Sequence, residues 1–184
     1  SQTTWESPTC IFQPEGVKDV QVIVSRLVSK NISFAIRSGG HSVIPGASNI
    51  NQGVLIDMSR LSGIQYDAAN NVALIGAGQR WENVYNHLDN YNVTIVGGRV
   101  LDVGVGGLTL GSMLLPYGFL FHSVCTLTLV SGGLSYLSDL YGLACDNVAS
   151  FEVVLANGSV VNANEESHSD LFWALKVGFN NFGV

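Results

Sequence analysis

The chain has 184 residues, of which 47% are hydrophobic and only 12% are charged. This composition excludes a disordered chain, and the length is sufficient to bury the core of one domain. The net charge is −6 and the sequence pI is about 5.0, without the basic stripe of a nucleic-acid-binding protein, so we expect no nucleic-acid partner.

The first half of the chain predicts two amphipathic helices and several short strands. Apolar residues recur at helical spacing from Val17 to Val28, and the strand-like run Ile32 to Ile36 follows. Further strands are predicted at Val54 to Asp57 and Val72 to Ile75. A second helix is predicted over Trp81 to Leu88, before a short strand at Val93 to Val96.

The second half ends in a predicted hairpin and a helix. Asn157-Gly158, the dipeptide typical of two-residue hairpin turns, separates the apolar runs Val148 to Leu155 and Ser159 to Val161. Ser169 is expected to cap a last helix that extends through Leu175. Strands and helices are mixed without internal repeats, which predicts an α/β or α+β domain.

The three cysteines, Cys10, Cys125 and Cys145, are far apart in the sequence, and none belongs to a Cys-x-x-Cys pair. A metal site is therefore not expected, while one disulfide remains open.

Three glycosylation sequons begin at Asn31, Asn92 and Asn157, although Asn157 also serves the hairpin turn. The first residues lack both Met and a leader-like pattern, so either a leader was removed or the chain is a fragment. We expect a secreted glycoprotein.

The segment Arg37-Ser38-Gly39-Gly40-His41-Ser42 predicts a cofactor-binding turn after a strand. Tandem glycines reach backbone conformations closed to other residues and leave room for a ligand, and exposed N–H groups beside an Arg suit a phosphate. His41 follows directly, where a bound group could touch it.

A second segment, residues 97 to 111, contains six glycines that alternate with Val and Leu. A flexible linker would be polar, so this run predicts buried backbone close to a large ligand, with N–H groups free to bond ligand oxygens. Neither a Rossmann fingerprint in its usual setting nor a Walker loop occurs.

Four motifs, in this order, resemble the FAD-binding (PCMH-type) domain of the vanillyl-alcohol-oxidase superfamily, in its berberine-bridge-enzyme-like fungal branch. They are Arg-Ser-Gly-Gly-His at 37–41, Gly-Gly-Arg-Val-Leu-Asp-Val-Gly-Val-Gly-Gly at 97–107, Tyr-Gly-Leu-Ala-Cys-Asp-Asn at 141–147, and Asn-Asn-Phe-Gly at 180–183. The resemblance implies an FAD-binding domain of two small α/β subdomains, about 1–60 and about 61–184.

The resemblance also implies the cofactor contacts. His41 matches the family's flavin-attachment histidine, which implies FAD bound covalently through its ring. The other matching positions are Arg37, Ser38, Gly39, Gly40, Ser42, Val103, Gly104, Val105, Gly106, Gly107, Thr109, Gly111, Asp146, Asn147 and Val148. Val100 stands where members with two covalent links have a cysteine, so a cysteinyl link is not expected.

Residues Met113 to Val130 depart from the family pattern. They form an apolar stretch, and no formally charged residue occurs between Asp102 and Asp139. A run of this length would suit a membrane span of about 20 residues, but Pro116, His122 and the lack of basic flanks disfavour one. Removal of the stretch nearly restores the family's continuous run, so we expect a retained intron here.

The chain stops at Val184, where the family continues into a substrate-binding domain, and Lys176 to Phe179 stand where the family has glycines. The resemblance implies an oxidase of alcohols or saccharides that passes electrons to oxygen, but no catalytic residue is assigned within these 184 residues. Three interpretations stay open: a truncated FAD-binding domain with impaired activity, a non-enzymatic remnant that binds no flavin, and a single-span membrane protein.

Overall fold

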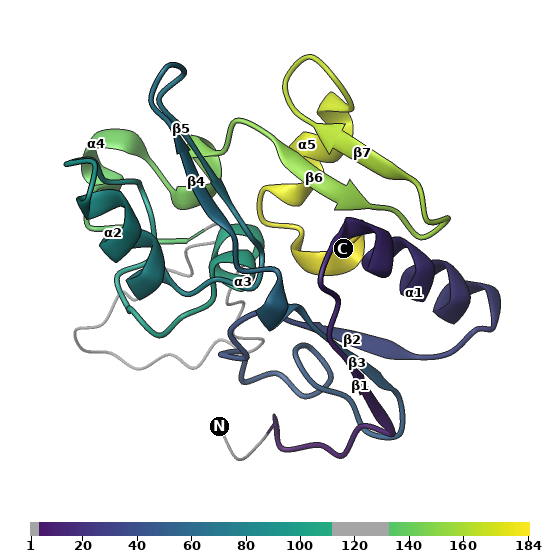
Figure 1. Ribbon diagram of the computed structural model, residues 1–184. Helices are drawn as coiled ribbons and strands as arrows, with labels where there is room; N and C mark the ends of the chain where they lie inside the picture. Colours follow the sequence, from purple (N-terminus) through teal and green to yellow (C-terminus); the bar gives the residue numbers. More distant parts are fainter. Residues whose placement is uncertain (1–3, 112–132) are drawn as a thin grey trace, which may run out of the picture.

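The computed structural model of the chain describes residues 4–111 and 133–184. The predicted insertion at Met113 to Val130, and the retained-intron hypothesis with it, lie outside the described residues. The fold mixes short strands and helices in three packed groups, which Figure 1 shows around α1, around α2 and around α5.

The first group is a parallel sheet covered by one helix. The strands β1 (Cys10–Phe12), β2 (Phe34–Arg37) and β3 (Val54–Asp57) pair in the order β1-β3-β2. Helix α1 (Val17–Ser29) makes the crossover from β1 to β2 and buries Val20, Val24 and Leu27 against Ile56 and Met58. Its apolar spacing predicts this face, and the helix is confirmed.

The second group packs helix α2 (Trp81–Asp89) on the antiparallel pair β4 (Ile64–Asp67) and β5 (Val72–Ile75). Trp81, Val84 and Leu88 are buried on the inner face of α2. Helix α2 and strand β5 are confirmed, whereas β4 had no clear signal in the sequence.

The third group consists of the hairpin β6 (Phe151–Val154) and β7 (Val160–Ala163) with helix α5 (Ser169–Leu175). The Asn157-Gly158 turn is confirmed, because Gly158 has φ +82° and the Asn157 carboxamide accepts hydrogen bonds from Ser159. The backbone of Val184 bonds that of Val154 in both directions, so the last residue lies along β6.

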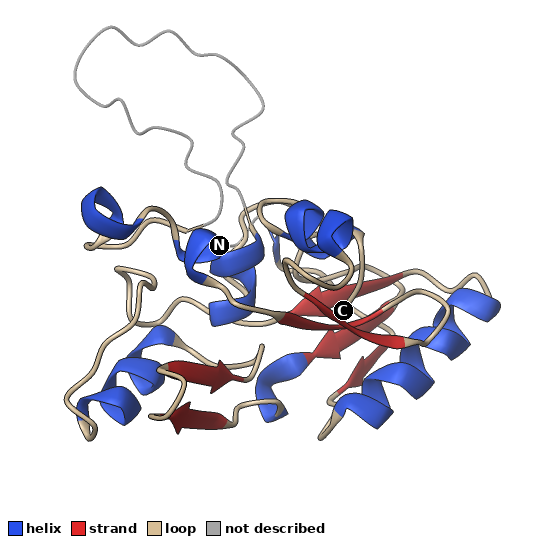
Figure 2. Ribbon diagram, turned by 90° about the horizontal axis from the view of Figure 1, so that it is seen from above, coloured by secondary structure: helices blue, strands red, loops and turns tan. Residues whose placement is uncertain are grey.

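Short helices connect the groups. They are α3 (Val105–Leu110) and α4 (Ser138–Tyr141), with the 3-10 helices η2 (Met58–Arg60), η3 (Ala144–Asn147) and η4 (Phe179–Asn181). Viewed from above in Figure 2, α1 and α2 lie at opposite sides of the molecule.

Two local predictions are wrong. Val93 to Val96 form no strand: the Val93 N–H bonds the Leu88 carbonyl at the end of α2, and Val93 and Ile95 pack against the α2 core as loop residues. Val93 and Ile95 alternate with polar residues because their side chains are partly buried against α2, although their backbone pairs with no strand. Ser169 is also not the cap of α5, because His168 occupies that position in a left-handed conformation and no side-chain cap bond forms.

The predicted boundary between the two subdomains, near residue 60, remains a prediction. The hydrophobic core between α1 and β3 also includes Val154 of β6, and Val160 and Val184 pack against it. Residues from the C-terminal part of the chain therefore complete the core of the first group. Among the described residues, no helix is long and apolar enough to cross a membrane, and Cys10 and Cys145 are free thiols.

Candidate cofactor site

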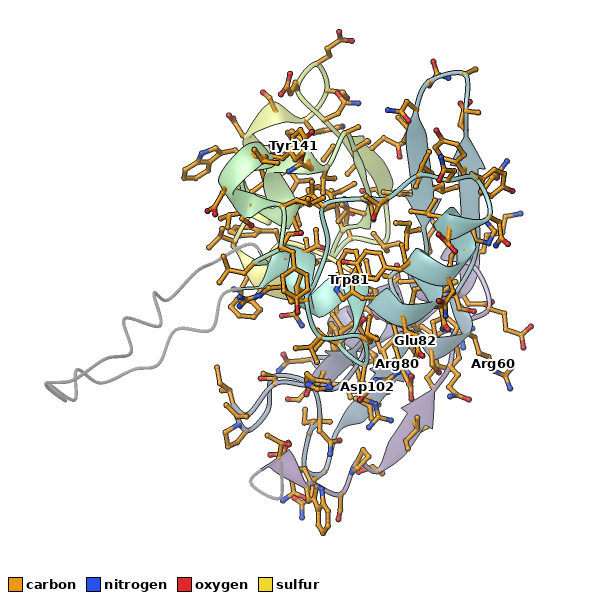
Figure 3. All side chains as sticks on the ribbon, turned by 90° about the vertical axis from the view of Figure 1, so that its left-hand side faces the viewer. Arg60, Arg80, Trp81, Glu82, Asp102 and Tyr141 are labelled. Carbon is orange, nitrogen blue, oxygen red and sulfur yellow. The ribbon has the colours of Figure 1, made fainter. Side chains whose placement is uncertain are left out.

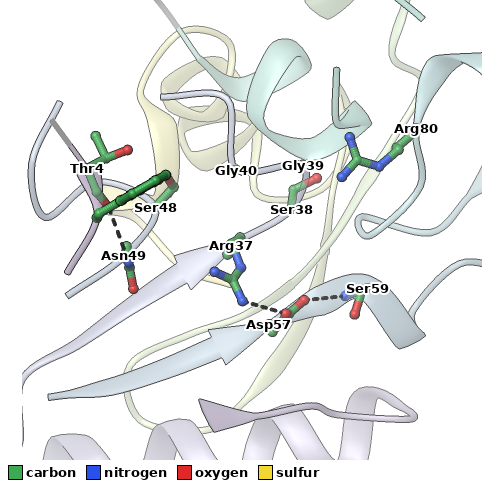
Figure 4. A pocket seen from close by; sticks show the side chains of 11 residues that line it. Thr4, Arg37, Ser38, Gly39, Gly40, Ser48, Asn49, Asp57, Ser59 and Arg80 are labelled. Carbon is green, nitrogen blue, oxygen red and sulfur yellow. Dashed lines mark hydrogen bonds and ion pairs between the residues drawn. The ribbon is translucent and has the colours of Figure 1, made fainter. Parts of the chain in front are cut away.

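A cavity of about 410 Å³ lies at the carboxyl end of β2, where the predicted cofactor turn begins. Arg37 to Gly40 line its floor, and Arg80 closes one end. Figure 4 shows Thr4, Ser48 and Asn49 toward the other end, with Arg37 between. The ends of parallel strands are a usual place for ligands in α/β folds. Here the guanidinium groups of Arg37 and Arg80 line the cavity together with the Asp57 carboxylate.

Arg37 is held in place by Asp57 at the end of the neighbouring strand. Its Nη2 donates to Asp57 Oδ2 at 2.8 Å, and the Ser59 N–H donates to Oδ1 at 3.1 Å. Burial raises the pKa of Asp57, but these hydrogen bonds and the Arg37 charge outweigh it, so the pKa lies below its ordinary value. The pairing fixes the guanidinium beside the cavity.

The two glycines of the turn serve different needs. A Cβ on Gly39 would lie 2.3 Å from the Gly104 nitrogen and 2.6 Å from its Cα, so the two backbones touch there. Gly40 has φ +71°, which L residues rarely adopt. We predicted that both glycines make room for a ligand, but at Gly39 the room is taken by the second glycine-rich segment.

His41, Asp102 and Arg80 form a chain of polar contacts beside this junction. The Asp102 carboxylate accepts from Arg80 Nη1 at 2.5 Å through Oδ1 and lies 3.3 Å from His41 Nε2 through Oδ2. Figure 3 shows Arg80 and Asp102 next to each other at the start of α2. The side chain of His41 is 48% exposed, so its ring is accessible.

The backbone around Asp102 is held by α2. Glu82 N–H bonds the Leu101 carbonyl, Trp81 N–H bonds the Val103 carbonyl, and Arg80 pairs with Gly104 in an isolated antiparallel bridge. Residues 101–104 therefore run alongside the start of α2 and bring Asp102 to Arg80.

Asn49 contributes an unsatisfied acceptor to the cavity wall. Its Nδ2 donates to the carbonyls of Thr4 and Glu6, both at 3.2 Å, while Oδ1 is buried and has no hydrogen-bond partner among the described residues. Buried polar atoms are nearly always paired, so an atom of this kind on a cavity wall indicates a missing donor.

The glycine-rich segment is only partly as predicted. Gly104 and Gly106 lie against Ser38 and Gly39, and Thr109 is buried, so the structure brings Val103 to Gly107 beside the turn. The prediction of free N–H groups is wrong at three positions, because Val103, Val105 and Leu108 donate to the carbonyls of Val100, Gln79 and Gly104. Residues 105–110 form helix α3.

The remaining predicted positions lie farther from the cavity. Gly111 follows α3 and faces the ring of Phe179, and the Ser42 hydroxyl accepts from the Ile44 N–H. Asp146 and Asn147 belong to η3, which packs on α3, and Val148 follows it. The Asp146 carboxylate accepts from Leu143 N–H, and Asn147 Nδ2 donates to the carbonyls of Tyr141 and Leu143, so these two side chains order their own turn.

The segment that replaces the family's glycines contains unusual backbone. Val177 has φ +92° and Phe179 has φ +56°, both in the range that favours glycine. A positive φ is especially unfavourable for a β-branched residue. The backbone thus follows a path suited to glycine, while the side chains at these positions are large.

Arg80, Asp102 and Asn49 were not among the predicted site residues. Asp102 lies inside the quoted glycine-rich motif, so its charge in an otherwise apolar run was a usable signal. Arg80 and Asn49 reach the cavity only through tertiary packing, and no local pattern marks them.

The chain is similar in sequence to proteins that bind FAD. A sequence profile described as FAD binding domain matches residues 8–133. An FAD-dependent monooxygenase, tpcD, from Cochliobolus heterostrophus is 45% identical over 177 residues, covering 96% of this chain and 30% of that protein. The chain therefore spans about a third of the length of the curated relatives it matches.

Solved structures share the fold. A berberine-bridge-enzyme-like protein from Physcomitrella patens superposes with a TM-score of 0.79 at 29% identity, over 97% of this chain and 35% of that one. Glucooligosaccharide oxidase from Acremonium strictum, which is described with a 6-S-cysteinyl, 8α-N1-histidyl FAD, gives a TM-score of 0.77 at 26% identity, over 96% of this chain and 33% of that one. The predicted fold class is confirmed.

The residues present fit a flavin dinucleotide. The cavity offers two guanidinium groups and glycine backbone for a pyrophosphate, and the unpaired Oδ1 of Asn49 offers an acceptor for an N–H or O–H donor. An accessible imidazole stands at the end of the turn. The predicted cofactor, FAD, is supported by the matched profile and by the covalent FAD named for one neighbour.

Proposed function

Since this chain belongs to the FAD-binding domain family, we propose that residues 37–42 hold the FAD pyrophosphate and that His41 carries the flavin covalently. Arg37 and Arg80 would neutralise the phosphate charge, and the turn backbone would donate N–H groups to it. The flavin itself would accept the substrate's electrons, as flavins do in oxidoreductases. The observation that carries this proposal is the accessible His41 ring, which follows the glycine turn that lines the cavity with Arg37 and Arg80.

The nitrogen available for attachment follows from the hydrogen bond to Asp102. A carboxylate only accepts hydrogen bonds, so a hydrogen bond at the 3.3 Å contact with Asp102 requires the proton on Nε2 of His41. In a neutral imidazole the other nitrogen, Nδ1, then keeps its lone pair. We therefore assign Nδ1 as the attachment atom.

In the longer protein, the activity we propose is flavin-dependent oxidation of an alcohol or saccharide, with oxygen as the electron acceptor. The sugar oxidase among the structural neighbours supports this class, whereas the fungal relatives are named monooxygenases. No group among the described residues is assigned as its catalytic base. The substrate would be a small molecule that binds to parts of the longer protein outside this domain.

The test is flavin binding by the chain itself. The 184-residue chain and a variant lacking Met113 to Val130 are incubated with FAD, desalted, and measured by visible absorption before and after acid precipitation. Flavin in the native protein supports the assigned cavity, and flavin that stays in the precipitate and is lost in His41→Ala supports the covalent link. Colourless protein in both forms would contradict the proposal and support a remnant that binds no flavin.

A second proposal concerns the cell compartment. Asn31 and Asn92 are exposed at the ends of α1 and α2, and no described side-chain bond occupies either carboxamide. We propose that the protein is secreted and glycosylated at these two positions, while the Asn157 carboxamide is engaged in its turn. Protein secreted by a fungal host should lose mass on treatment with an N-glycosidase, by two glycans at most, and unchanged mass would refute this.

A further inference from the structure

The contact between His41 and Asp102 points to a specific role for the carboxylate. We propose that Asp102 is a positioning residue that holds His41 in the tautomer competent for flavin attachment and stabilises the charge that attachment leaves on the ring. This rests on the proposed function of His41. Three observations carry it: the division of the carboxylate between His41 and Arg80, the independent anchoring of the two loops, and the charge balance of the bond that forms.

The first observation is the division of the carboxylate between two partners. Oδ1 of Asp102 accepts from Arg80 at 2.5 Å, and Oδ2 lies 3.3 Å from His41 Nε2. Arg80 also bonds the Asp102 main-chain carbonyl, so one guanidinium holds both the backbone and the carboxylate of Asp102. With one oxygen engaged, the other has a defined direction toward the imidazole.

The second observation is that both loops are fixed independently of this contact. Residues 101–104 run along the start of α2, and Gly104 touches Gly39 two residues before His41. The side chain of Asp102 is 73% exposed, and exposed ion pairs contribute only about 0.2–1 kcal/mol to stability. Holding the fold together is therefore a poor explanation for the contact, and orientation of His41 is a better one.

The third observation is chemical. When Nδ1 forms the C–N bond with the 8α carbon, the lone pair of Nδ1 supplies the bonding electrons and a C–H bond of that methyl group breaks. Its proton passes to solvent, and its electron pair passes into the isoalloxazine, from which molecular oxygen later removes it. Because Nε2 keeps its proton while Nδ1 gains a carbon, the imidazole becomes cationic. A carboxylate at hydrogen-bond distance from Nε2 stabilises that cation.

The experiment has one arm that needs no flavin. Nitrogen–proton correlation spectra of the apo chain, labelled with ¹⁵N histidine, report which ring nitrogen carries the proton. We expect His41 to be protonated at Nε2 in the wild type and mixed in Asp102→Asn. Protonation at Nδ1 in the wild-type chain would overturn the proposal, whether or not the protein binds flavin.

The second arm measures attachment. Asp102→Asn, Asp102→Glu and the wild type are incubated with FAD in air, and acid-stable flavin is followed with time against total bound flavin. We expect attachment in Asp102→Asn to be at least about tenfold slower, by analogy with carboxylates that orient metal-bound histidines, with partial rescue in Asp102→Glu. Asp89→Asn removes an equal charge at the exposed end of α2 and should attach flavin at the wild-type rate.

The outcomes separate the two proposals. Wild-type chain with Nε2 protonated but no bound flavin would refute the flavin site and leave the tautomer assignment standing. Equal attachment rates in Asp102→Asn and wild type would refute the positioning role. If Asp102→Asn also lost more than about 4 °C in unfolding midpoint, which exceeds the largest effect of an exposed pair, its contribution would be structural and the proposal would fail.

Discussion

The contact between Gly39 and Gly104 makes Gly39→Ala the sharpest test of the structure. The new Cβ would lie 2.3 Å from the Gly104 nitrogen and 2.6 Å from its Cα, whereas ordinary contacts begin at 3.4 Å. Both obstructing atoms are backbone, and Gly104 is tied to the start of α2 through its bridge with Arg80. The overlap of about 1 Å must therefore be relieved by displacing one of the two loops.

Overpacking of this kind costs about 1–3 kcal/mol. For a chain of this size, 1 kcal/mol lowers the unfolding midpoint by about 2–4 °C, so we expect Gly39→Ala to unfold about 2–12 °C lower than the wild type. Flavin binding should weaken as well, since the displaced loop carries Arg37 and His41. Thermal unfolding followed by circular dichroism, with flavin absorption on the same samples, measures both effects.

Gly107→Ala is the matched control, because it adds the same methyl group in the same segment. Nothing lies within 4 Å of its Cβ, and the residue is in helix α3. Replacing glycine by alanine in a helix stabilises by about 0.5–1 kcal/mol, so the sign should reverse. Equal unfolding midpoints for Gly39→Ala and the wild type would refute the packing of the two glycine segments described above.

Three further predictions follow from individual side chains. Val177→Gly should stabilise the chain by about 1 kcal/mol in urea unfolding, because it relieves a left-handed β-branched residue at φ +92°; a destabilised variant would show that the conformation is not strained. Asp57→Asn should destabilise by about 1.5–3 kcal/mol at pH 7 through loss of the bond to Arg37. The pKa of Asp57 in the folded chain lies below the ordinary 3.8, so its contribution to the free energy of unfolding is present above about pH 4 and is lost as the pH falls further. The difference in unfolding free energy between Asp57→Asn and the wild type should therefore shrink in acid. A difference that stays constant with pH would contradict this. Burial raises the pKa of Tyr85 to about 12, and the Tyr85 hydroxyl donates to the Gly98 carbonyl. The wild type should therefore lose stability relative to Tyr85→Phe as the pH rises from 10 to 12. Stability that changes in parallel with pH in the two proteins would exclude the raised pKa.

The elements that the sequence predicted correctly share a local cause. Helices α1 and α2 have apolar faces at helical spacing, and the β6–β7 turn contains Asn157-Gly158, whose Gly adopts φ +82°. These preferences act over a few residues, so they are visible without the fold. The family resemblance extends this to the cofactor, because four motifs in order identify an FAD-binding domain.

Tertiary structure decided what the local signals could not. Val93 and Ile95 look like a strand, yet they cover the core of α2 as a loop, since burial and strand pairing leave the same apolar pattern. Arg80 and Asn49 reach the cavity from separate loops, and Asp102 contacts Arg80 and His41 beside it. Only packing brings these residues to the turn.

The turn at residues 37–42 illustrates the division. Its sequence predicts a tight turn after a strand that is compatible with a phosphate, because tandem glycines permit unusual backbone conformations and Arg37 supplies a positive charge. Only the tertiary structure assigns Gly39 to a backbone contact with Gly104 and places Asp102 against His41. Contacts between residues about 60 positions apart depend on how the loops pack, and that is not encoded in any short stretch of the chain.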